Sequence, residues 1–205
     1  MMLGYVDRVD DHVIATKFEF LLIPVSSMYV TGESSERHGN RTTFGWSGVP
    51  IRFNFKSAAL AYPRIWLWFL AFAWPFLTHY GENVESMTWK DWMPPLAMIV
   101  AAILSNFVGG LSRREKSRLR VLGERTGMKI DPSKLNGFTR ETKRQILEDA
   151  MTAVELPLTP EECARVAASA PTEALPLLYT FTRYSGDSPA WRAASSVALA
   201  RIEAA

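Results

Sequence analysis

The sequence predicts an α+β membrane protein with a small N-terminal β region, a two-helix transmembrane hairpin and a C-terminal all-α helical domain. The expected boundaries are residues 1–56, 57–111 and 112–205. Charge segregation is the first reason, because 21% of the chain is charged but residues 57–111 carry only five charged side chains. Secondly, β-branched and aromatic residues enrich the segment before this stretch, while helix start signals recur after it. The aromatic content of 12% and the single cysteine exclude a disordered chain and a disulfide scaffold.

The N-terminal region has the composition of β-strands. Residues 12–16 and 17–23 are rich in β-branched and aromatic side chains, Pro24 interrupts them, and residues 25–31 resume the pattern. A last strand is expected over residues 51–56, where apolar and polar side chains alternate strictly before the first apolar segment. This sheet could lie on the bilayer surface or be an ordinary half-buried sheet.

Within this region, a short run is similar to one found in small uncharacterised bacterial two-span membrane proteins. It consists of Thr16-Lys17-Phe18 followed by Ile23-Pro24-Val25-Ser26-Ser27-Met28-Tyr29-Val30 and covers about fifteen residues. In that group an aromatic-rich strand and a proline-broken strand precede helical spans. The resemblance implies a bacterial inner-membrane protein with a small cytosolic sheet, and it implies no activity.

Two apolar segments, residues 58–80 and 93–111, suggest membrane-spanning helices. A helix rises about 1.5 Å per residue, so the first segment can cross a hydrocarbon layer of roughly 30 Å if Arg64 extends to the interface. In the second segment only Ser105 and Asn106 are polar. Aromatic side chains typical of membrane interfaces flank the first span, with Tyr62, Trp66 and Trp68 at one end and Tyr80, Trp89 and Trp92 at the other. The alternative is a pair of buried helices in a soluble core.

The distribution of basic residues predicts the orientation. Residues 112–120 carry five cations and one anion, whereas the connecting loop at residues 81–92 carries one cation and three anions. By the positive-inside rule, both termini are expected in the cytoplasm, and the resemblance implies that the hairpin lies in a bacterial inner membrane. We expect no signal peptide, because the first eleven residues contain three aspartates where a basic leader and an apolar stretch would be needed.

The C-terminal region contains start signals for several short helices. Thr159-Pro160-Glu161-Glu162 has the pattern of a capping box, and Ser188-Pro189 repeats the cap followed by proline. An earlier helix is expected over residues 139–156, where Ile146, Leu147 and Met151 have core spacing. Five short helices are expected in all, as a small bundle or as stacked hairpins.

A stripe of small side chains in the second apolar segment is the candidate helix-packing site. It consists of Ala97, Ala101, Ser105 and Gly109, which recur every four residues, with Asn106 beside them. Small residues let another helix approach closely, and a buried amide needs a hydrogen-bonding partner. The stripe could pack the two helices of one chain together, or it could join copies of the chain or a second membrane protein.

Basic side chains near the apolar segments are candidates for contact with lipid head groups. They are Arg64, Arg113, Arg114, Lys116, Arg118 and Arg120. Attraction to anionic head groups explains this cluster better than nucleic-acid binding does, because no aromatic side chains that could stack on bases are interleaved with the cations. The expected partners are therefore an anionic bilayer and a protein partner or a second copy, without nucleic acid.

The sequence contains no recognisable catalytic or metal-binding arrangement, and no cofactor is expected. His12, His38 and His79 are far apart, and Cys163 has the setting of a small packing residue. The expected function is a membrane-anchored structural or adaptor protein that presents a helical interaction domain at the cytoplasmic face, possibly within a larger complex. The alternative is an oligomeric membrane-permeabilising or transport element. A third possibility is a lipid-directed enzyme using Arg64, His79 and Asn106.

Overall fold

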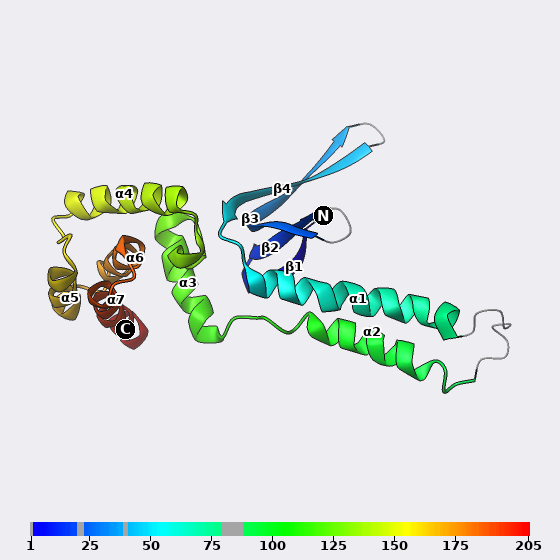
Figure 1. Ribbon diagram of the computed structural model, residues 1–205. Helices are drawn as coiled ribbons and strands as arrows, with labels where there is room; N and C mark the ends of the chain where they lie inside the picture. The colour runs from blue at the N-terminus through cyan, green and yellow to red at the C-terminus, as the bar shows by residue number, and fades with distance from the viewer. Residues whose placement is uncertain (1, 20–22, 39–40, 79–87) are drawn as a thin grey trace. The chain divides into compact units, whose positions relative to one another are not determined.

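The computed structural model describes residues 2–19, 23–38, 41–78 and 88–205 (Figure 1). The chain divides into two compact units. The first, called here the sheet unit, contains residues 1–49 and 53–110; the second, the helical unit, contains residues 50–52 and 111–205. Among the residues discussed above, His79 and Tyr80 lie outside the described part of the chain.

The sheet unit begins with a four-stranded sheet in the order β1-β2-β3-β4. The strands are β1 (Met2–Val9), β2 (His12–Glu19), β3 (Ile23–His38) and β4 (Arg41–Ile51), and β1 and β3 both pair with β2 in the antiparallel sense. Val13, Ala15 and Val30 form a small buried cluster on it. Register irregularities interrupt β1, where Gly4 and Asp7 have positive φ angles of 66° and 53°.

The predicted strand over residues 51–56 is wrong, because β4 ends at Ile51 and helix α1 (Phe55–Thr78) begins soon after it. Asn54 explains the difference. Its side-chain oxygen accepts a hydrogen bond from the backbone N–H of Ser57 at 3.1 Å, which is the geometry of a helix N-cap. Asn54 also donates its own N–H to the Ser27 hydroxyl on β3 at 2.9 Å. The apparent alternation therefore crosses a strand end and a helix start.

The first turns of α1 are held on the sheet by buried polar contacts. The Ser57 hydroxyl donates to the Gly4 carbonyl at 2.6 Å and accepts from Thr16 at 2.8 Å. A side chain at Gly4 would collide with the Ser57 carbonyl oxygen, so the close approach of β1 and α1 requires glycine. Ala58 and Ala61 complete this buried end of the helix. The second helix of the unit, α2 (Met93–Ser105), lies alongside α1 (Figure 1).

The predicted two-helix transmembrane hairpin is wrong. Within the described residues only α1, with 24 residues, is long and apolar enough to cross a membrane. The second helix has 13 residues, or about 20 Å, against a hydrocarbon layer of roughly 30 Å. It ends early because the side chains of Ser105 and Asn106 hydrogen-bond back to the carbonyl of Ala102, and Gly109 then adopts a left-handed φ of 95°.

The helical unit contains the five predicted helices, which are thereby confirmed. They are α3 (Arg113–Thr126), α4 (Gly137–Ala153), α5 (Pro160–Ser169), α6 (Leu175–Ser185) and α7 (Pro189–Ala204), with the short 3-10 turn η2 (Pro132–Lys134) between α3 and α4. The central helix is α6, which contacts the other four and has eight of its 11 residues buried (Figure 1). Ser188 caps α7 through the N–H of Trp191, as expected from the Ser-Pro pair.

Two helix starts differ from expectation. Ser112 and Glu115 form a full capping box on α3, whereas only the basic character of this segment was predicted. At the predicted capping box on α5, the Thr159 hydroxyl instead donates to the Glu162 carboxylate at 2.8 Å, and the Thr159 side chain makes no capping hydrogen bond to the helix backbone.

Candidate functional site

An exposed apolar surface extends along α1 and α2, and it is the most unusual feature of the sheet unit. Only four of the 24 residues of α1 are buried, and three of these lie in the part seated on the sheet. Beyond Arg64, α1 carries no charged side chain, and α2 carries none at all. The exposed large side chains are Trp66, Trp68, Phe69, Leu70, Phe72, Phe76 and Leu77 on α1 beyond Arg64, and Met93, Leu96, Val100, Ile103 and Leu104 on α2. We call this surface the apolar pair; a continuous patch of this kind marks contact with a membrane or a partner protein.

The predicted small-residue stripe does not lie on one covered face of α2. Ala97 and Ala101 are exposed, Ser105 and Gly109 are half-buried, and Asn106 is exposed. The fully buried small residue on this helix is Ala102, at 0% exposure. Asn106 also satisfies its amide locally, because Nδ2 donates to the Ala102 carbonyl at 2.9 Å.

Arg64 joins the end of α2 to the first strand. Its Nε and Nη2 donate to the Ser105 carbonyl at 3.2 and 2.8 Å, Nη2 also donates to the Val108 carbonyl at 3.0 Å, and Nη1 donates to the Tyr5 carbonyl at 3.1 Å. Backbone carbonyls at a helix C-terminus attract cations, so Arg64 stabilises the end of α2. The sequence predicted only that this side chain would extend toward lipid head groups.

A hollow of about 270 Å³, called here the basal pocket, surrounds Arg64. The residues that line it come from β1, from β2 and from the ends of the apolar pair: Tyr5, Val6, Asp7, Arg8, Val13, Arg64, Asn106, Val108, Gly109 and Gly110. Asp7 is almost fully buried, and its carboxylate accepts a hydrogen bond from Lys56 Nζ at 2.7 Å. The other cations of the lining, Arg8 and Arg64, contact no carboxylate among the described residues.

The predicted head-group cations of α3 have different surroundings. Arg114 forms a bidentate ion pair with Glu203 on α7, with N–O distances of 2.9 and 2.7 Å. Arg118 points into the helical unit, where Nε donates to the Tyr179 hydroxyl at 3.3 Å. Arg113 and Arg120 are exposed and Lys116 is half-exposed. Arg114 and Arg118 are therefore committed to contacts within the unit.

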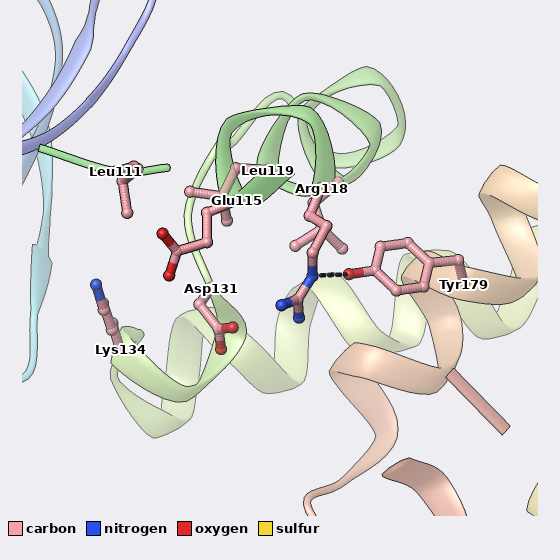
Figure 2. A pocket seen from close by; sticks show the side chains of 8 residues that line it. Leu111, Glu115, Arg118, Leu119, Asp131, Lys134 and Tyr179 are labelled. Atoms are coloured by element: carbon pink, nitrogen blue, oxygen red, sulfur yellow. Dashed lines mark hydrogen bonds between the residues drawn. The ribbon is translucent and has the colours of Figure 1, made fainter. Parts of the chain in front are cut away.

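The helical unit has a hollow of its own, of about 160 Å³, between α3, η2 and α6 (Figure 2). Leu111, Leu119 and Leu122 supply an apolar lining, and the charged side chains of Glu115, Arg118, Asp131 and Lys134 surround it together with Tyr179. Equal numbers of cations and anions line the hollow. Their charges balance within it, as is typical of a structural polar cluster.

Asp131 and Arg118 of this hollow have shifted pKa values. Burial of the Asp131 carboxyl raises its pKa, but the charge of Arg183, whose Nη2 lies 2.7 Å away, and hydrogen bonds from Ser133 outweigh burial, so the pKa of Asp131 lies below its usual range. The Tyr179 hydroxyl raises the pKa of Arg118 more than burial lowers it. Both side chains are thus charged at neutral pH.

No metal-binding cluster of histidine, cysteine or carboxylate side chains occurs among the described residues. Cys163 is fully buried, and its thiol donates to the Pro157 carbonyl at 3.1 Å. Burial, together with the charge of Glu162, raises the pKa of this thiol to about 11. A nucleophile needs the thiolate form, so Cys163 is placed as a packing residue.

Two features of the site were missed in the sequence analysis. One is the cap that Arg64 supplies to α2, and the other is the participation of β1 through Asp7 and Arg8. The Asp7-Arg8 pair precedes a strand turn and carries no motif, so only the fold could bring it to the end of the apolar pair. Ser57 did carry a signal, because it follows an N-cap asparagine by three residues.

Comparisons with known proteins give no relative. No family model, no curated protein and no solved structure matches the chain.

Proposed function

We propose that the protein is a membrane-anchored adaptor of the bacterial inner membrane, held by the apolar pair and presenting the helical unit to a partner at the cytoplasmic face. The observation that carries this proposal is the exposed apolar surface beyond Arg64. Side chains as large as Phe72 and Phe76, which are 67% and 76% exposed, are not covered by any described residues of the sheet unit. Burying them in lipid would recover the free energy that exposure to water costs.

The lengths of the two helices favour insertion into the membrane from one side. Residues 65–78 of α1 extend about 21 Å and α2 extends about 20 Å, so the exposed parts match each other in length. Both are shorter than the hydrocarbon layer of roughly 30 Å. Lys56 and Arg64 lie toward the end of α1 that is seated on the sheet. The chain enters and leaves the apolar pair at this same end, since the Asp7 N–H donates to the Gly109 carbonyl at 3.4 Å. Both termini are therefore proposed to lie on one side of the membrane, and the basic residues of α3 favour the cytoplasm.

A charged side chain placed on the apolar pair tests whether this surface anchors the protein in the membrane. Phe72→Lys should reduce flotation with phosphatidylcholine vesicles by tens of times to about a hundredfold, because lysine in the hydrocarbon layer costs about 3 kcal/mol more than phenylalanine. Ile146→Lys is the matched control, since Ile146 is also exposed, at 54%, but lies on α4 of the helical unit. Equal flotation of the two variants would overturn the anchor.

The adaptor role has its own test. Crosslinking in native membranes, followed by mass spectrometry, should recover a second protein attached to residues of the helical unit. Recovery of the chain only with copies of itself would contradict the adaptor role and leave the anchor standing.

One observation favours the second candidate, an oligomeric membrane-permeabilising or transport element. Ala97 and Ala101 face away from the covered side of α2, so a helix of another copy could approach them closely. Ala101→Leu should then lower the oligomeric mass in detergent, and vesicles carrying the wild-type protein should leak ions. An unchanged mass together with intact vesicles would exclude this candidate.

A further inference from the structure

We propose that the basal pocket binds the phosphodiester group of an anionic phospholipid. This inference rests on the proposed membrane anchor and adds a specific binding site for one lipid molecule. A hollow of about 270 Å³ is smaller than the roughly 300–1,000 Å³ of pockets that enclose whole drug-sized ligands, so it suits a head group whose acyl chains remain outside.

The basal pocket has an excess of positive charge, which favours an anionic ligand. The Asp7 carboxylate in the lining is matched by Lys56 at 2.7 Å, which leaves the charges of Arg8 and Arg64 without a carboxylate among the described residues. Arg64 is anchored by the carbonyls of Tyr5, Ser105 and Val108, and these engage four of its five N–H groups. Arg8 is exposed, and its side chain makes no hydrogen bond or ion pair with a described residue, so its guanidinium can close over an anion.

The backbone supplies the second observation. Gly109 and Gly110 line the pocket, and neither donates its N–H to an acceptor in the described parts of the chain. Successive N–H groups near a left-handed residue form a concavity that favours anions, and the φ of Gly109 is 95°. A Cβ atom at this position would lie 2.6 Å from Leu60 Cδ1, so the Leu60 side chain would have to move.

The position of the pocket selects a lipid over a free anion. It lies at the polar end of the apolar pair, at the level of Arg64, and Val108 in its lining is 56% exposed. A phosphodiester seated there would direct its acyl chains along the exposed apolar surface. Inorganic phosphate has no acyl chains, so it would make only the polar contacts in the pocket.

Lipid retention tests the proposal. The full-length protein is released from detergent with phosphatidylglycerol or phosphatidylcholine present, and native mass spectrometry counts the lipid molecules retained. Arg8→Gln should reduce retention of phosphatidylglycerol about fivefold, the effect of one cation near an anionic surface. The matched control is Arg165→Gln, which removes an exposed cation from α5 of the helical unit and should leave retention unchanged.

The outcomes separate this inference from the anchor itself. Flotation of Arg8→Gln with phosphatidylcholine vesicles should equal that of wild type, since the apolar pair is unaltered. Equal phosphatidylglycerol retention by Arg8→Gln and Arg165→Gln would overturn the pocket while leaving the anchor intact. Displacement of the lipid by an equal concentration of inorganic phosphate would overturn the assignment to a phospholipid. Absence of flotation for every variant would instead remove the anchor.

Discussion

Helices α1 and α6 are both rich in large apolar residues, but their surroundings are opposite. Eight of the 11 residues of α6 are buried, whereas four of the 24 residues of α1 are buried. The difference comes from the neighbouring elements: four helices contact α6, while α2 is the one helix packed against α1 among the described residues. An apolar composition thus shows that the side chains of a helix are more stable away from water. Whether other parts of the protein cover them depends on the fold.

The largest expected effect contrasts one leucine from each helix. Leu178 on α6 is 0% exposed, so Leu178→Ala should lower the free energy of unfolding by about 2–5 kcal/mol through the lost contacts and the cavity left behind. Leu77 on α1 is 67% exposed, and Leu77→Ala should change the same quantity by less than about 0.5 kcal/mol. Urea unfolding of both variants in detergent measures this; equal losses would mean that α1 is covered by protein.

An intermediate effect is expected from the half-buried ion pair between Asp131 and Arg183 in the helical unit. Asp131→Asn should destabilise the protein by about 1.5–3 kcal/mol at pH 7, because Arg183 loses its charged partner. The pKa of Asp131 is lower in the folded state, so its contribution is present above the ordinary value of 3.8 and is lost as pH falls through the folded value. Thermal unfolding should therefore show the difference between wild type and variant shrinking below about pH 4. A difference that does not depend on pH would contradict the ion pair.

The smallest effect concerns Cys163, which reports whether the helical unit stays closed. Because its pKa is about 11 and its side chain is buried, the thiol should not react with an aromatic disulfide reagent at pH 8 unless the protein is unfolded. Rapid reaction of the native protein would show that α5 opens readily. Reaction in urea provides the control for reagent access.

Helix starts that depend on a few neighbouring residues were predicted correctly from the sequence. The helix starts at Pro160 and Pro189 follow cap-and-proline patterns, and the confirmed count of five C-terminal helices depends on such signals. The strand over residues 51–56 was wrong because Asn54 caps a helix, and a side-chain alternation of three pairs cannot detect a cap. The transmembrane hairpin was wrong because a hydropathy pattern does not show where a helix ends. Here α2 ends where the side chains of Ser105 and Asn106 donate hydrogen bonds to the Ala102 carbonyl.

The basal pocket could not be predicted from the sequence, for a different reason. Arg8, Arg64 and Gly109 are separated by long stretches of chain, and they meet only because β1 and the end of α2 both reach the seated end of α1. Arg64 was identified as a cation near an apolar segment, but its three carbonyl partners depend on where α2 ends. Nothing in the local sequence of Asp7 and Arg8 indicated their place beside it.

Quenching of single tryptophans by lipids brominated along their acyl chains tests most directly whether the apolar pair lies in lipid. One variant retains only Trp68 on α1, which is 39% exposed. The other retains only Trp191, which packs edge to face against Phe181 in the helical unit. We predict strong quenching of Trp68 and none of Trp191 in the same vesicles. Unquenched Trp68 fluorescence in protein that floats with those vesicles would contradict insertion of the apolar pair.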